Sequence, residues 1–128
     1  MNGLHLIADL HGCRCQPEFL LDAGELEAFS VASCRRHGLA VVGRCFHQFS
    51  DANGQRAGVT GTVVLAESHL ALHTWPEVGG VTLDLYVCNF SADNSGIAHA
   101  VFEEIIGAFA PGHAEKKTVQ RGVIQRRT

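Results

Sequence analysis

The feature that most restricts the fold is a series of short runs in which apolar and polar residues alternate. In residues 68–75, Leu70 and Leu72 would lie on one face of a strand, with His69 and His73 on the other. Residues 81–90 alternate in the same way, and residues 59–66 are rich in β-branched side chains. Short turns connect these runs, which favours an antiparallel sheet.

Two further segments predict helices. Asp22 is expected to cap a helix that ends before Gly38, with Glu25 three residues later as in a capping box. A second helix with an apolar stripe follows the polar segment 91–96 and ends at Pro111. Other strands are expected at 3–10, at 39–49 and, as an edge strand, near 117–124. This order predicts an α+β domain, a two-layer sandwich of a mainly antiparallel sheet with two helices on one face.

Composition and length set limits on the class of protein. The 128 residues suit one domain, 1–128, and 46% are hydrophobic. The uncovered sheet face could pack on a second copy, giving a four-layer αββα dimer. A net charge of −3 argues against a nucleic-acid partner, and no apolar run is long enough for a membrane span. The N-terminus does not resemble a signal peptide, so we expect a cytoplasmic protein, and five cysteines do not suggest a disulfide framework.

The polar residues allow more than one kind of site. His69 and His73 could point at one ion, and the segment 11–15, HGCRC, adds a histidine and two cysteines. The C-x-C spacing is unusual for zinc and nothing brings the two groups together, so no metal site is predicted. Ser68 with His73 is instead the minimal pair for an activated nucleophile. Taken alone, these residues leave a catalytic and a structural interpretation open.

A family resemblance narrows this choice. Residues 67–77, ESHLALHTWPE, closely resemble the signature of bacterial S-adenosylmethionine decarboxylases of the short prokaryotic class, which are pyruvoyl enzymes. GLHLIADL is similar to the first strand of that family, CFHQF to its aromatic strand, GVTGTVVLAESH to the approach to its cleavage site and LDLYVC to its cysteine-bearing strand. The resemblance covers about residues 3–110 in the expected order.

The resemblance implies a proenzyme that cuts itself between Glu67 and Ser68. The products would be a β chain, 1–67, and an α chain, 68–128. The Ser68 hydroxyl would attack the carbonyl carbon of Glu67 and convert the amide to an ester, and elimination would leave a pyruvoyl group in place of the serine. Processing roles in the family fall on the residues that match His73 and, with a hydroxyl, Thr60.

The resemblance also implies the reaction of the mature enzyme. The pyruvoyl group would form a Schiff base with S-adenosyl-L-methionine and accept the electrons released with CO2, giving the aminopropyl donor for spermidine synthesis. Cys88 matches the proton donor of the family. Its members pair so that two copies build each site. Substrate contacts are implied for Phe49, Trp75, Glu77, Asp9 and the backbone of Leu70.

Two alternative functions remain beside this interpretation. A pyruvoyl decarboxylase of ornithine or arginine would share the fold, but those substrates lack adenine, so the presence of Phe49, Trp75 and Glu77 favours the adenosyl substrate. A non-cleaving module that binds a metal or another ligand would remain one 13.8 kDa species. His69 has no predicted role.

Overall fold

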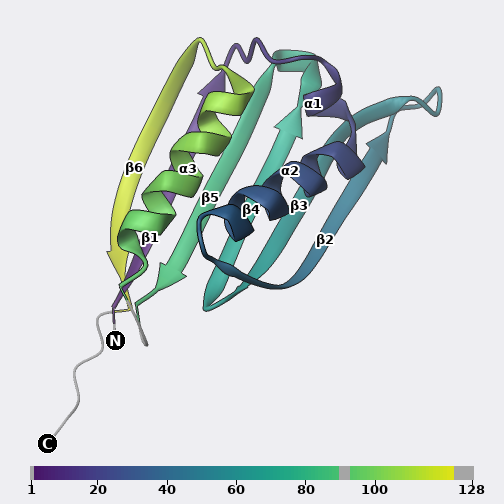
Figure 1. Cartoon of the computed structure of the whole chain (residues 1–128). Coiled ribbons are helices and arrows are strands. Elements are labelled where there is room, and N and C mark those ends of the chain that lie inside the picture. Colours follow the sequence, from purple (N-terminus) through teal and green to yellow (C-terminus); the bar gives the residue numbers. More distant parts are fainter. Residues whose placement is uncertain (1, 90–92, 123–128) are drawn as a thin grey trace, which may run out of the picture.

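Six antiparallel strands form one sheet in the computed structural model, of which residues 2–89 and 93–122 are described (Figure 1). The strands are β1 (Gly3–His11), β2 (Ala40–Ser50), β3 (Arg56–Ala66), β4 (Ser68–Trp75), β5 (Gly80–Cys88) and β6 (His113–Arg121). Their order in the sheet is β2-β3-β4-β5-β1-β6. The first strand therefore lies inside the sheet, between β5 and the edge strand β6. The predicted antiparallel sheet is confirmed.

The helices pack on one face of this sheet, as predicted (Figure 1). They are α1 (Glu18–Leu21), α2 (Ala23–Arg36) and α3 (Ser95–Phe109), and a short 3-10 helix, η1 (Pro76–Val78), joins β4 to β5. The one-turn helix α1 was not predicted. Apolar side chains of α2 and α3 meet the inward-facing residues of the strands, and this layer is the hydrophobic core. Within the described ranges, no helix has the length and apolar character needed to cross a membrane.

The start of α2 follows the predicted cap in part. The Asp22 carboxylate accepts a hydrogen bond of 3.1 Å from the backbone N–H of Glu25. The reciprocal bond of a capping box is not made, because the Asp22 N–H donates to the carbonyl of Glu18 in α1. Gly38 follows the helix with φ of +96°, as expected for a residue at this position.

The last strand lies earlier in the chain than predicted. We expected it near 117–124, but β6 is His113–Arg121, and residues 123 and 124 lie outside the described part. Ala110 adopts a left-handed conformation that ends α3, and the chain turns back at once through Gly112, whose N–H donates to His11 and Gly12. This tight turn lets β6 begin beside the end of β1.

Among the elements that the structure describes, no helix covers the opposite face of the sheet, which we call the open face (Figure 1). The register aligns its side chains in rows across the strands. One row is Thr60, His73, Thr82 and Asp9, another is Val64, His69, Tyr86 and His5, and a third is Cys88, Gly3 and Arg121. The alternation predicted for residues 68–75 and 81–90 is thus confirmed as far as β4 and β5 extend; β5 ends at Cys88, and residue 90 lies outside the described part.

Candidate functional site

One end of the open face holds a cavity of about 310 Å³, here called the aromatic pocket. Thr60 and His73 are register partners, and Thr60 Oγ1 is hydrogen-bonded to His73 Nδ1 at 3.1 Å. The His73 and Trp75 rings lie 6.0 Å apart between centroids. The structure therefore brings four predicted residues together. The lining is Phe49, Ala57, Gly58, Thr60, His73, Thr74 and Trp75.

A glycine keeps this pocket open. Gly58 has φ of +147°, and a Cβ at this position would lie 2.8 Å from the carbonyl oxygen of Thr74. Phe49 lies on β2, opposite Gly58 of β3, and is 47% exposed. Trp75 is 42% exposed. Two aromatic faces beside an imidazole suit a ligand that carries a flat ring or a positive charge.

The predicted cut lies at the opposite end of the sheet, which we call the cut-site end (Glu67, Ser68 and Cys88). Ser68 pairs with Leu65 and Val87, two residues of the core. The backbone N–H of Cys88 donates a 3.2 Å hydrogen bond to the carbonyl oxygen of Glu67. Ser68 has φ of +132°, in a region that is nearly exclusive to glycine and costs about 1–3 kcal/mol for other residues. A polarised carbonyl next to a strained serine suits attack by that serine on the preceding peptide.

These two ends are far apart within one chain. Ser68 and His73 are five positions apart on β4, which at about 3.3 Å per residue separates their Cα atoms by roughly 16 Å. An imidazole side chain cannot span that distance. Thr60 shares a row with His73 and Thr82. Cys88 lies six residues beyond Thr82 on β5 (88 − 82). A single chain thus keeps His73 and Thr60 away from the serine that they would assist.

The remaining predicted residues differ in their surroundings. Asp9 and His73 line the same small cavity, of about 60 Å³. Glu77 lies in η1, directly after the aromatic pocket, and is exposed. Leu70 is 1% exposed, points toward the helices, and lies in a strand paired on both sides, so its backbone is engaged by the sheet. The structure gives no support to a contact between Leu70 and a ligand.

Three cysteines outside the cut-site end are poor nucleophiles at neutral pH. Burial raises the pKa of the Cys34 thiol to about 11. Burial, with a smaller effect of Cys15, raises the pKa of Cys13 to about 11, and burial also raises the pKa of Cys15. Since the thiolate is the reactive form, these thiols remain protonated and inert.

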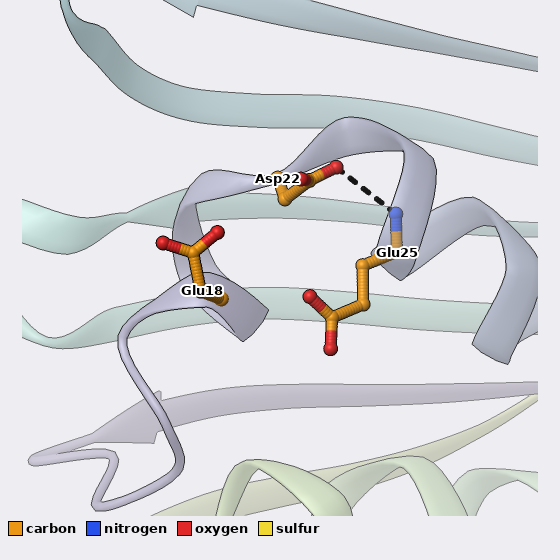
Figure 2. A group of neighbouring side chains, drawn as sticks. All are labelled: Glu18, Asp22 and Glu25. Atoms are coloured by element: carbon orange, nitrogen blue, oxygen red, sulfur yellow. Dashed lines mark hydrogen bonds between the residues drawn. The ribbon is translucent and has the colours of Figure 1, made fainter.

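The histidine pair that could have bound a metal does not converge. His73 is bonded to Thr60, whereas His69 Nε2 lies 3.9 Å from Asp84 Oδ1. In the described ranges, the one group of three possible ligand side chains is Glu18, Asp22 and Glu25, shown in Figure 2.

The three acidic residues of Figure 2 have a structural explanation. Asp22 caps α2, and Arg56 donates to Glu18 at 2.7 and 2.8 Å and to Asp22 at 3.2 Å. Hydrogen bonds from Arg56 lower the pKa of Glu18. The group therefore joins α1 and the start of α2 to the beginning of β3.

Sequence reasoning missed a cluster around Tyr86, which we call the Tyr86 cluster (His5, His69, Asp84, Tyr86 and Arg121). The His5 and His69 rings lie 5.7 and 6.0 Å from the Tyr86 ring, and the Arg121 guanidinium lies 5.3 Å above it. Asp84 Oδ2 lies 3.8 Å from His5 Nε2. Burial lowers the pKa of His5 and outweighs the opposing effect of Asp84. Alternation in β5 predicted that Asp84 and Tyr86 share one face of the strand with Cys88. The strand order β5-β1-β6 could not be predicted from the sequence.

Comparisons with known proteins agree on one family. Residues 4–122 match the family model for S-adenosylmethionine decarboxylase. The S-adenosylmethionine decarboxylase proenzyme of Syntrophomonas wolfei is 34% identical over 123 residues, which is 96% of this chain and 89% of the relative. That of Pyrococcus horikoshii is 31% identical over 121 residues, 94% and 79% of the two chains. The crystal structure of adenosylmethionine decarboxylase from Aquifex aeolicus VF5 is similar with a TM-score of 0.83 and 28% identity, over 98% of this chain and 95% of that one.

Proposed function

Because the chain belongs to the S-adenosylmethionine decarboxylase family, we propose that it makes a pyruvoyl group from its own Ser68 and that two copies build each active site. Decarboxylation of S-adenosyl-L-methionine by this family of carboxy-lyases depends on a self-derived pyruvoyl group and provides the aminopropyl donor for spermidine synthesis. The division of the chain at residue 67, the roles of individual residues and the dimer are our proposals.

The cut falls between Glu67 and Ser68 and leaves a β chain, 1–67, and an α chain, 68–128. The Ser68 hydroxyl adds to the carbonyl carbon of Glu67, and negative charge develops on the carbonyl oxygen. The Cys88 N–H, at 3.2 Å from that oxygen, is placed to stabilise the charge. The reaction relieves the strain in the backbone of Ser68, and this relief favours the cut.

A second copy supplies the groups that one chain holds too far away. If two copies pack face to face about a two-fold axis that runs between their open faces and across the strands, the aromatic pocket of one copy lies over the cut-site end of the other. Phe49, Val64, Trp75 and Val119 expose 40–47% of their surface on this face, and burying them would favour such a pairing. His73 of the second copy then acts on Ser68, and Thr60 orients it through Nδ1 while leaving Nε2 available.

The residues around the cut fit the reaction that follows. A pyruvoyl group at position 68 supplies a carbonyl that accepts the electrons released with CO2. Cys88 holds the proton for the substrate α-carbon. The aromatic pocket of the second copy holds the adenosyl and sulfonium part of the substrate between Phe49 and Trp75. Glu77 binds the ribose hydroxyls, and Asp9 lies beside His73 as a further acidic contact.

The aromatic pocket is the observation that carries the choice of substrate. Ornithine and arginine have no ring to place between Phe49 and Trp75, and their extended side chains would leave both aromatic faces exposed to water. The pocket therefore favours S-adenosyl-L-methionine over either amino acid.

Intact-mass measurement and CO2 release test this function. We expect the purified protein to give two fragments divided before Ser68, with a carbonyl at the start of the second, whereas Ser68→Ala remains at 13.8 kDa. Ser50→Ala, at the exposed end of β2, serves as the matched control and should be cut normally. Carboxyl-labelled S-adenosyl-L-methionine should release CO2, and labelled ornithine and arginine should not. A wild-type chain that stays whole on incubation would contradict the proposal.

A further inference from the structure

We propose that Tyr86 is a positioning residue for Cys88. Its ring holds the thiol in place for protonation of the substrate and separates that thiol from the Arg121 guanidinium. The inference rests on the proposed role of Cys88 as the proton donor. It also assigns a role to the Tyr86 cluster, which the proposed function leaves unused.

The ring of Tyr86 leans into the row that contains Cys88. Gly3 is the register partner of Cys88 on β1. A Cβ added to Gly3 would lie 2.8 Å from both Cε2 and Oη of Tyr86, so the ring occupies the space above Gly3. Tyr86 comes two residues before Cys88 on the same face of β5, and its ring thus extends diagonally toward the side of the thiol. Absence of a side chain at residue 3 makes this arrangement possible.

Arg121 approaches the same ring from the other side. Gly3 pairs with Cys88 on β5 and with Arg121 on β6, so these three residues form one row. The Arg121 guanidinium lies 5.3 Å from the centroid of the Tyr86 ring, a cation–π distance, and its Nη1 lies 3.2 Å from His5 Nδ1. The aromatic ring therefore stands between a cation and the thiol.

Two histidines hold the ring from neighbouring strands. His5 on β1 meets it edge-on at 65°, and His69 on β4 meets it at 49°. Asp84 lies 3.8 Å from His5 Nε2 and 3.9 Å from His69 Nε2, so one carboxylate is close to both imidazoles. Contacts from three strands leave the ring little freedom to move. His69, which the sequence left without a role, contributes one of them.

The position of the thiol matters because two carbons compete for one proton. Protonation of the substrate α-carbon gives the amine product and restores the pyruvoyl ketone. Protonation of the other carbon, which came from the ketone, leaves an alanyl residue at position 68 after hydrolysis. The ketone oxygen left as water when the Schiff base formed, so the substrate departs as CO2 and an aldehyde whose oxygen comes from the hydrolysing water, while its nitrogen stays on the chain. The enzyme has no reactive carbonyl afterwards, so a misplaced thiol shortens its working life.

The first test measures how often the wrong carbon is protonated. Mass spectrometry of the N-terminal peptide of the α chain gives the fraction of alanine at position 68, which is divided by the CO2 released. We expect Tyr86→Ala, and Gly3→Ala through displacement of the ring, to raise this ratio about tenfold, equivalent to ~1.4 kcal/mol between the two barriers. Tyr86→Phe retains the ring, so its ratio should stay within about twofold of the wild-type ratio. The roughly tenfold rise is expected only where the ring is lost or displaced. Gly107→Ala, where a Cβ meets no neighbour within 4 Å, is the control for Gly3→Ala.

The second test does not require the pyruvoyl group. In the uncut Ser68→Ala protein, alkylation of Cys88 by iodoacetamide is followed by peptide mapping, with exposed Cys45 as the internal standard. Tyr86→Ala should raise the rate at Cys88 about three- to tenfold, because the thiol is uncovered and a nearby cation favours the thiolate. Arg121→Gln added to Tyr86→Ala should reverse part of that rise.

The outcomes separate this inference from the proposed function. A wild-type protein that neither cuts itself nor releases CO2 contradicts the proposed function, while the alkylation test still reports on the ring. If the wild type is active but Tyr86→Ala and Gly3→Ala match it in alanine formation and alkylation, the positioning role is overturned. If Tyr86→Phe forms as much alanine as Tyr86→Ala, the hydroxyl rather than the ring is responsible, and the inference is wrong.

Discussion

At the scale of single residues, the proposed cut depends most on the bond between Thr60 and His73. Thr60 Oγ1 lies 3.1 Å from His73 Nδ1, and the two residues are paired across β3 and β4. A β-branched threonine has few χ1 rotamers in a strand, so its hydroxyl is held toward the imidazole. In the proposed dimer, Nε2 of His73 is then the nitrogen that would exchange a proton with Ser68 of the other copy.

Replacing that hydroxyl should slow the cut. Thr60→Val preserves the shape of the side chain and removes the bond, which we expect to reduce the rate of fragment formation about tenfold or more, as for a lost hydrogen bond of ~1–3 kcal/mol. Thr60→Ser should be cut at nearly the normal rate. Thr62→Val, on the same face of β3 and opposite Ala71, is the control. The rate follows from intact mass against time, and normal cutting of Thr60→Val would contradict the role of Thr60.

At the scale of elements, the start of α2 fixes how the helical layer meets the sheet. Asp22 caps the helix and also accepts from Arg56, which belongs to β3. Glu18 of α1 binds the same guanidinium through both oxygens. The expected capping box would have used the Glu25 side chain, but the extra turn of α1 already provides an acceptor for the Asp22 N–H. One arginine thus joins two helices to the sheet.

Removing the cap should weaken the fold measurably. We expect Asp22→Ala to lower the free energy of unfolding by about 1 kcal/mol, the usual cost of a lost N-cap. Glu25→Gln should have less than half of that effect, because the contribution of Glu25 to the cap is its backbone N–H. Urea unfolding of the uncut Ser68→Ala protein measures both. An equal loss for the two variants would indicate that the Glu25 carboxylate closes the box after all.

At the scale of the whole molecule, the sheet keeps the two sets of proposed functional residues apart. His73 and Thr60 lie at the end that contains the aromatic pocket, and Ser68 and Cys88 lie at the cut-site end. Strand geometry enforces the separation, because extended chain advances about 3.3 Å per residue and cannot fold back within β4. Two copies facing each other would combine the two sets twice, once at each end.

Mixed dimers test this arrangement directly. Ser68→Ala and His73→Ala proteins should each stay uncut when expressed alone. When the two chains are co-expressed with different tags, the His73→Ala chain should be cut, because its Ser68 meets the intact His73 of the Ser68→Ala chain. Cutting should be absent when the His73→Ala chain is paired with the double variant Ser68→Ala/His73→Ala. If no mixed pair is cut although the two chains copurify, the two residues act within one chain and the composite site is wrong.

Much of the fold was predictable because it depends on local patterns. Alternation in residues 68–75 and 81–90 gave the two strands that contain His73 and Cys88, and the cap at Asp22 located α2. The start of β6 was missed although Pro111 and Gly112 mark a turn, because the strand begins where His113 can pair with His11 of β1, which is a long-range contact. The cluster around Tyr86 was missed for a related reason, since its members come from strands far apart in the chain.

By itself, the sequence determined most of the strands and their faces, the two long helices and the resemblance to one family. These are properties of neighbouring residues, because side-chain alternation and helix caps act over a few positions. Only the tertiary structure decided that β1 enters between β5 and β6, that Tyr86 leans over Gly3, and that Thr60 lies beside His73. Those relations depend on strand order and register, which arise when distant segments pair and bury a common core.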